Sequence, residues 1–375
     1  MVPVRIAIIG TGGMGRQYAA LLAGGRAESL QLAAVVCRHD PARQWAAETL
    51  PADVWAAPDA DTLYTRADSF DAVLIATPHS THPALAMQAF AHGKHVLCDK
   101  PSANALGPAL EMNRAAAESG LTFGMVFHQR LYPQYIRLRE LVQSGALGRI
   151  TRVRLENSRY FRTQVYHDSS AWRSSWGGEG GGVLINQAQH LLDIWQWIFG
   201  MPQSVYAAIP FGKYNSFLVD DEATLLMEYP DARTAVFTIS RGEGTFTEQL
   251  EVVGTRGTAL LEENTLTLRR YDCDTDEYRR TARCFERELL HETTTRETIP
   301  YDPHPYAPLL DNFGRAVRYG EPLIAPGYEG VNALQLADAA YLSAWLGRKM
   351  TLPIDPALFA RELARHVEEE RHAQP

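Results

Sequence analysis

The chain has 375 residues, of which 46% are hydrophobic and 21% charged, and its formal net charge is −8. The length predicts two domains, and the composition is that of an ordinary globular protein. The acidic balance argues against nucleic acid or an anionic membrane surface as the main partner, and no run approaches the roughly 18 apolar residues of a membrane span.

The cysteines follow no metal-binding or disulfide pattern. The four are Cys37, Cys98, Cys273 and Cys284, which form no CxxC pair and no cluster with histidine at zinc spacing. We therefore expect free thiols, no metal site and a cytoplasmic protein. Because the first predicted strand begins near residue 4, we also expect no cleavable signal peptide.

The most specific local motif lies at the start of the chain. The apolar run Val4–Ile9 leads into a glycine-rich turn, and a helical pattern follows at Gln17–Leu22. The turn reads Gly10, Thr11, Gly12, Gly13, Met14 and Gly15. We expect Gly10 to make the turn, Gly12 to let a pyrophosphate approach the backbone, and Gly15 to let helix and strand pack closely. Since a helix N-terminus holds phosphates, the motif predicts a dinucleotide site; the alternative is a glycine-rich loop in an ordinary α/β domain.

Strand-like and helical segments alternate over residues 1–126. The strand-like runs are Leu30–Cys37, Ala72–Thr77, His95–Cys98 and Thr122–Val126, and the helical segments are Pro41–Thr49, Pro83–Ala91 and Leu106–Glu118. This rhythm predicts a doubly wound parallel sheet, a Rossmann dinucleotide-binding domain, whose ligand lies at the carboxyl ends of the strands. The residues that follow those ends are candidate cofactor contacts: Arg38, His39, Thr77, Pro78, His79, Asp99 and Lys100.

Arg38 bears on the choice of cofactor. An acid about 20 residues past the glycine motif accepts the ribose hydroxyls in NAD enzymes, and Arg38 stands where that acid is usual. A guanidinium can pair with the 2′-phosphate of NADP, but it can also stack on the adenine of either nucleotide while Asp40 reaches the ribose. We expect NAD(P), with NADP favoured.

Residues 127–375 predict an α+β domain with a large, mostly antiparallel open sheet. Short alternating runs occur at Ile150–Leu155, Val205–Ile209, Ala223–Glu228, Thr234–Ser240, Gln249–Val253, Thr258–Glu262 and Leu266–Arg269. The charged segment Asp272–Glu297 is expected to be an exposed insertion. The arginines at positions 149, 152, 154, 159 and 162 are expected to pair with acids on a solvated strand face rather than to bind an anion.

A glycine-rich approach, Ser174–Gly182, leads into a predicted helix over Val183–Phe199. One face of this helix carries Asn186, His190, Asp193 and Trp197, opposite an apolar stripe. A solvent-facing stripe would look the same, but the glycines allow another backbone or a ligand to come very close. We therefore interpret the polar face as catalytic.

Together these motifs resemble the Gfo/Idh/MocA oxidoreductases. The resemblance covers nearly the whole chain and includes residues 76–82, 93–101, 144–150 and 181–193, then Gly327-Tyr328-Glu329-Gly330 and Leu352-Pro353. It implies a Rossmann domain followed by a domain with an open, mostly antiparallel sheet that packs against a partner subunit, hence a homodimer or homotetramer through that sheet. It also adds His82 to the cofactor contacts.

The resemblance implies that Lys100, in the motif Asp99-Lys100-Pro101, and His190 are the catalytic pair. Two departures matter: the family's Glu before the lysine is Asp99 here, and the acid four residues before the histidine is Asn186. Neutral imidazole suits removal of a hydroxyl proton near pH 7, and an ammonium stabilises the developing alkoxide. We interpret Asn186 as a hydroxyl binder.

The segment before the predicted helix supplies polar groups and flat aromatic faces for a polyol. The expected substrate contacts there are Tyr160, Arg162, Trp172 and Arg173. His128 and Tyr306 are weaker candidates, His128 as a cofactor contact, and His304 is expected in a loop. The predicted function is NAD(P)-dependent hydride transfer to or from a secondary hydroxyl of a sugar, glycoside or cyclitol. The alternatives are an NAD-dependent glycosidase of the same family and a non-enzymatic nucleotide-sensing regulator.

Overall fold

The computed structural model describes residues 2–170, 172–300 and 306–373, which form two compact units. The first unit comprises residues up to Arg130 together with 178–180 and 304–334. The second comprises 131–177, 181–303 and 335–375. Each unit is described by itself, and His304 lies outside the described residues.

The first unit holds a six-stranded parallel sheet in the order β3-β2-β1-β4-β5-β6. Its strands are β1 (Val4–Ile9), β2 (Leu30–Val36), β3 (Trp55–Ala57), β4 (Ala72–Ile75), β5 (His95–Cys98) and β6 (Phe123–Met125). Its helices include α1 (Gly13–Ala23), α2 (Asp40–Thr49), α3 (Ala60–Tyr64), α4 (His82–Ala91), α5 (Leu106–Ser119) and α10 (Tyr306–Tyr319). The predicted βαβ rhythm and the parallel sheet are confirmed. The three-residue strand β3 was not predicted.

The second unit holds a nine-stranded sheet in the order β14-β13-β12-β11-β7-β10-β9-β8-β15. Its strands are β7 (Ile150–Asn157), β8 (Ser204–Ala208), β9 (Glu222–Glu228), β10 (Thr234–Ser240), β11 (Glu248–Gly254), β12 (Gly257–Glu262), β13 (Thr265–Tyr271), β14 (Glu292–Thr298) and β15 (Met350–Thr351). All neighbouring strands are antiparallel except β7 and β10. The mostly antiparallel sheet is therefore confirmed.

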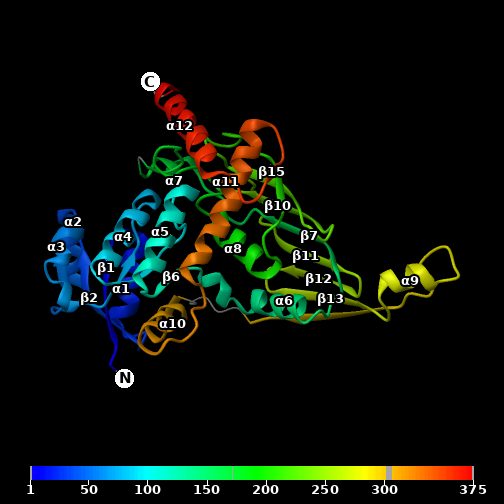
Figure 1. The fold of residues 1–375 in the computed structure, drawn as a ribbon, viewed down its shortest axis with the longest axis horizontal. Coiled ribbons are helices and arrows are strands. Elements are labelled where there is room, and N and C mark those ends of the chain that lie inside the picture. Colours follow the sequence, from blue (N-terminus) through cyan, green and yellow to red (C-terminus); the bar gives the residue numbers. More distant parts are fainter. Residues whose placement is uncertain (1, 171, 301–305, 374–375) are drawn as a thin grey trace. The chain divides into compact units, whose positions relative to one another are not determined.

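The helices of the second unit are α6 (Pro133–Gln143), α7 (Gln164–Asp168), α8 (Ala188–Phe199), α9 (Thr275–Thr281) and α12 (Pro356–Ala373). Helix α11 (Gly330–Leu346) begins in the first unit and continues in the second. The segment Asp272–Glu297 is largely exposed, as predicted, but it is ordered as α9 and β14, and α9 projects beyond the far end of β13 in Figure 1.

Helix α8 begins at Ala188, five residues later than predicted. Residues 183–187 form turns instead, because Ala188 N–H bonds to the carbonyl of Val183, five residues back. Asn186 therefore lies in a turn before the helix, whereas His190 lies in the first turn of α8.

Candidate active site

The glycine-rich turn leaves the start of α1 open. Gly12 is the N-cap of α1, and a Cβ placed on Gly12 would have no heavy atom within 4 Å. The first turn of α1 carries no acidic side chain, so its N–H groups and positive dipole end face no competing carboxylate within the helix. These residues fit a pyrophosphate group of a dinucleotide.

The other two motif glycines are required by close contacts. Gly10 has a φ of +106°, and a Cβ there would lie 2.5 Å from the carbonyl oxygen of Ala76. A Cβ on Gly15 would lie 1.9 Å from the carbonyl oxygen of Gly10. The turn and the close helix–strand packing expected of these two positions are therefore present.

Arginines gather near the carboxyl end of β2. Arg38 and His39 are exposed there, and Arg16 donates to the carbonyl of Thr11 at 3.1 Å and lies over the ring of Trp45. Arg43 bonds to the carbonyl of Cys37 at 3.1 Å and forms an ion pair with Asp40. The Asp40 side chain is 89% exposed, and one of its carboxylate oxygens pairs with Arg43.

His82 links two of the loops that carry predicted cofactor contacts. It is 1% exposed, and its ring nitrogens lie 2.8 Å from the carbonyl oxygens of Thr77 and Pro101. Burial lowers the pKa of His82, and the neutral ring can donate to only one of these carbonyls. Its position makes it a connector between Thr77 and the Lys100–Pro101 turn; His79 next to it is also buried, and Pro78 precedes the short 3₁₀ turn His79–Thr81.

Asp99 holds the backbone beside Lys100. Its carboxylate accepts from the Lys100 N–H at 2.8 Å and from the Tyr18 hydroxyl at 3.2 Å. Burial raises the pKa of Asp99, and the Lys100 ammonium opposes that rise. Asp99 therefore acts on the lysine through the backbone and through charge, and Lys100 itself is half-buried.

His128 and Tyr306 lie together in the first unit, with ring centroids 4.2 Å apart. Burial and then the nearby Lys100 charge lower the pKa of His128 to about 3. The ring is therefore neutral at pH 7 and adds no positive charge beside the lysine. Lys100, His128 and Tyr306 form one cluster in the first unit.

Asp220 fixes the segment before α8 in the second unit. Its carboxylate accepts from the N–H groups of Gly182 at 2.6 Å and Leu184 at 2.8 Å and from the Tyr341 hydroxyl at 2.7 Å. A Cβ on Gly182 would lie 1.9 Å from the carbonyl oxygen of Asp220, which is why glycine is needed there. Sequence reasoning missed Asp220 and Tyr341; the acidic pair Asp220-Asp221 before a strand was the available signal.

The last helix also contacts this segment. The carboxylate of Glu370, in α12, accepts from the N–H groups of Trp176 at 3.0 Å and Gly177 at 3.1 Å. Trp176 is buried and donates from its ring to the carbonyl of Leu218. Trp176 is thus a core residue, and Glu370 ties α12 to the start of the glycine-rich approach.

Of the predicted substrate contacts, Arg162, Trp172 and Arg173 gather around α7. The guanidinium of Arg173 lies over the rings of Tyr166 and Trp172, and that of Arg162 lies over Tyr166. Tyr160 lies close enough to Tyr135 to influence its titration. Lys100 belongs to the first unit, and His190 and Asn186 belong to the second.

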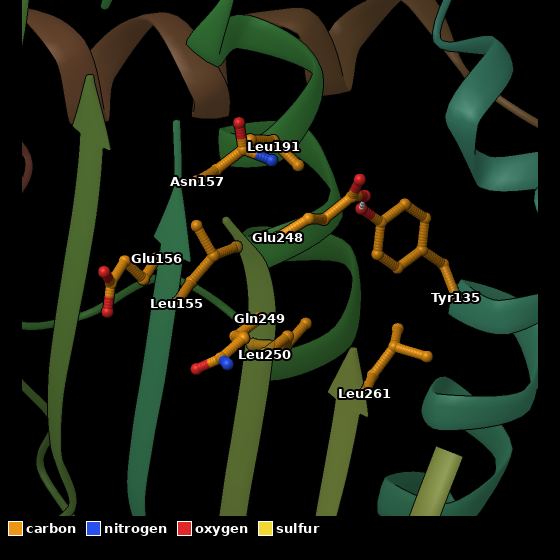
Figure 2. Close-up of a pocket in the computed structure, with 9 residues that line it drawn as sticks. All are labelled: Tyr135, Leu155, Glu156, Asn157, Leu191, Glu248, Gln249, Leu250 and Leu261. Atoms are coloured by element: carbon orange, nitrogen blue, oxygen red, sulfur yellow. Dashed lines mark hydrogen bonds between the residues drawn. The ribbon is translucent and has the colours of Figure 1, made fainter. Parts of the chain in front are cut away.

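A small hollow lies between the sheet and helices α6 and α8 of the second unit (Figure 2). Its walls include Tyr135, whose hydroxyl donates to Glu248 at 3.2 Å, and Leu191 beside His190. None of the predicted catalytic or substrate-binding residues lines it. Across the described ranges no group of three or more His, Cys, Asp or Glu side chains is placed to hold a metal, and no helix has the length and apolarity for a membrane crossing.

The chain matches the models of two known protein families. Residues 4–127 match the model of the oxidoreductase family with an NAD-binding Rossmann fold, and residues 135–260 match the GFO/IDH/MocA C-terminal domain. The chain belongs to the Gfo/Idh/MocA family.

Individual relatives are more distant. The chain is 30% identical over 189 residues to trans-1,2-dihydrobenzene-1,2-diol dehydrogenase of Bos taurus, covering 50% of this chain and 53% of the relative. It is 27% identical over 168 residues to the scyllo-inositol 2-dehydrogenase (NADP(+)) IolW of Bacillus subtilis, covering 44% and 46%. The alignments thus span about half of these relatives. The fold is similar to that of the WlbA dehydrogenase from Bordetella pertussis in complex with NADH and UDP-GlcNAcA, with a TM-score of 0.78, 21% identity and coverage of 94% and 100%.

We predict that Gly15→Ala destabilises the protein, because the added Cβ would meet the Gly10 carbonyl and force the turn apart. The loss in unfolding free energy should be about 1–3 kcal/mol or more, as in other overpacked sites. Gly13→Ala is the matched control, since a Cβ there meets nothing within 4 Å. Denaturant unfolding without nucleotide measures both, and equal stability of the two variants would contradict the packing role of Gly15.

Proposed function

We propose that the protein is an NAD(P)-dependent oxidoreductase that transfers a hydride between the nicotinamide ring and a secondary hydroxyl of a sugar, glycoside or cyclitol. The observation that carries the proposal is the pairing, in one Rossmann unit, of an open helix N-terminus at Gly12 with Lys100 at the end of β5. Family membership and relatives named as dehydrogenases support it.

Each residue of the proposed site has its own role in the hydride transfer. The bound nicotinamide supplies the hydride acceptor or donor. A neutral ring nitrogen of His190 takes the hydroxyl proton, and the Lys100 ammonium stabilises the developing alkoxide. Asn186 holds a second hydroxyl, since an amide both donates and accepts. The backbone bonds of Asp99 and Asp220 keep Lys100 and the His190 segment in place before substrate arrives.

His190→Ala should lower kcat by roughly 10²- to 10⁴-fold and leave nucleotide affinity nearly unchanged, because only the proton acceptor is lost. Lys100→Met should abolish the chemical step in a folded protein. Asn186→Ala should mainly raise KM, with a smaller loss of kcat. The assay is a panel of sugars, glycosides and cyclitols followed at the nicotinamide absorbance.

Product analysis completes this test. Near-normal turnover of His190→Ala or Lys100→Met on the substrate found in the panel would refute the assigned roles. Release of an aglycone without net nicotinamide reduction would replace the proposed reaction with glycoside cleavage.

We further propose that NADP is the preferred nucleotide. Arg38 is exposed at the end of β2, with Arg16 and Arg43 beside the same strand end, and Asp40 is engaged by Arg43. Guanidinium groups favour a 2′-phosphate, which a carboxylate in that position would repel. The naming of the Bacillus subtilis relative as NADP(+)-dependent supports the same choice.

Arg38→Ala should therefore weaken NADP binding by about 1.5–3 kcal/mol, the cost of one charge-assisted contact, and weaken NAD binding much less. Calorimetric titration with each nucleotide measures the two losses. Equal losses would mean that Arg38 stacks on adenine, and the preference for NADP would then be abandoned.

A homodimer or homotetramer through the second unit's sheet is also proposed. Side chains alternate along its strands, so that Leu225 and Phe237 are buried while Tyr206 and Leu226 on the other face are 46% and 44% exposed. Tyr206, Leu226 and Val236 pair across β8, β9 and β10 and form one apolar row. An apolar row on an open sheet face favours contact with a second copy.

Light scattering at micromolar concentration should give two or four times the 41.8 kDa chain mass. Leu226→Glu should shift the mass toward the monomer by placing a charge in the apolar row. Leu289→Glu is the control, because Leu289 is 62% exposed and lies outside the sheet face. A monomeric wild-type protein would end this proposal.

A further inference from the structure

The arginines of the second unit differ in whether a carboxylate pairs with them. Four arginines of the run 149–162 have carboxylate partners: Arg149 with Asp276, Arg152 and Arg154 with Glu251, and Arg159 with Glu248. These confirm the expected strand-face pairing. Among the described residues, Arg162 forms no ion pair, and neither do Arg173 and Arg241.

These three arginines lie near His167. Burial, and then the charges of Arg241, Arg173 and Arg162, lower the pKa of His167 to about 4, while Asp168 opposes the fall. His167 Nδ1 lies 2.6 Å from the Ser174 hydroxyl. The His167 ring is neutral at pH 7, and the three nearby guanidiniums give this part of the unit an excess of positive charge.

Arg241 lies at the inner end of this cluster and is fully buried. Its guanidinium donates to the Asp220 carbonyl at 3.1 Å and to Gln187 Oε1 at 3.5 Å, and its Nε is buried without a hydrogen-bond partner among the described residues. The Asp220 carboxylate feels this charge, but its oxygens accept from Gly182, Leu184 and Tyr341 instead. The contact with Gln187 connects the cluster to the neighbour of Asn186.

Arg162 and Arg173 form the outer end. Their guanidiniums lie 5.1 and 4.6 Å from the centre of the Tyr166 ring, and Arg173 also donates to the Tyr166 hydroxyl at 2.7 Å. The buried Nε of Arg173 has no hydrogen-bond partner within the described ranges. The nearby carboxylate of Asp168 accepts from Gln164 at 2.9 Å and pairs with neither arginine. Stacking on aromatic faces holds guanidinium groups in fixed planes, which prepares them for a planar or tetrahedral anion.

We propose that Arg162, Arg173 and Arg241 bind an anionic group on the substrate, so that the sugar carries a carboxylate or a phosphate. The proposal rests on the proposed function for the identity of the site as a sugar site. Guanidinium groups bind both anions through paired N–H bonds. A neutral sugar would supply no counter-charge to Arg162 and Arg173, which pair with no carboxylate among the described residues.

Binding, rather than turnover, tests the proposal. D-glucuronate, D-galacturonate and D-glucose 6-phosphate are titrated against their neutral hexoses, with NADP⁺ present, by calorimetry on the full chain. At least one acidic sugar should bind ten-fold or more tightly than its neutral hexose. Glucuronate or galacturonate as the tighter ligand identifies a carboxylate site, and glucose 6-phosphate a phosphate site.

Variants assign the effect to the cluster. Arg162→Gln and Arg173→Gln should each reduce the acidic-over-neutral preference about ten-fold. Arg149→Gln, which removes an arginine with a carboxylate partner, should keep the preference. Arg241 is fully buried, so the variant used at this position is Arg241→Lys, which keeps the charge. It should lower the acidic-over-neutral preference less than Arg173→Gln does.

A second readout follows the anion directly. Saturation with the preferred acidic sugar should raise the pKa of His167, measured by NMR titration of its ring, because the anion offsets the guanidinium field. Equal affinity for acidic and neutral sugars, or an unchanged His167 titration, overturns the proposal. If acidic sugars bind with the expected preference but no sugar reduces NAD⁺ or NADP⁺, the oxidoreductase proposal fails and the anion site stands.

Discussion

One buried carboxylate holds the backbone segment that leads into α8. Asp220 is fully buried, and its two oxygens accept from two backbone amides of the glycine-rich approach and from the Tyr341 hydroxyl. Burial raises the pKa of Asp220, while Tyr341, Arg241 and the two amides counteract this rise. Asp220 therefore accepts hydrogen bonds from the backbone before α8 and also balances part of the Arg241 charge. The turn that carries Asn186 and the first turn of α8 begin from this anchor.

Asp99 has a comparable position in the first unit. It too is a buried carboxylate that accepts from a backbone amide next to a predicted catalytic residue, and a tyrosine hydroxyl also donates to it. In both units a buried carboxylate accepts from main-chain amides. In the first unit the amide is that of Lys100 itself, and in the second the amides are those of Gly182 and Leu184, shortly before Asn186.

Local motifs were sufficient for much of the fold. The strand–glycine–helix start, the βαβ rhythm and the alternating strands of the second sheet depend on neighbours in sequence, and they were predicted within a few residues. The start of α8 was not, because the Asp220 bonds that shape residues 182–184 come from a residue 36–38 positions away. Of the cation cluster, Arg162 and Arg173 were predicted as substrate contacts. Arg241 was missed, because it bonds to Gln187 from 54 residues further along the chain. The two-residue strand β15 and the polar, fully exposed β14 carry no hydrophobic pattern from which to predict them.

The bond between Glu370 and the Trp176 amide spans 194 residues of sequence. Closing so long a loop costs entropy that other contacts must first offset, and during synthesis amino-terminal segments fold first. The Rossmann sheet is made of strands that precede residue 126 and can pair while the ribosome is still adding the second sheet. The glycine-rich approach, by contrast, lacks one of its fixed points until α12 has been made. The order of synthesis therefore lets the six-stranded parallel sheet form first and leaves the glycine-rich approach to be completed last.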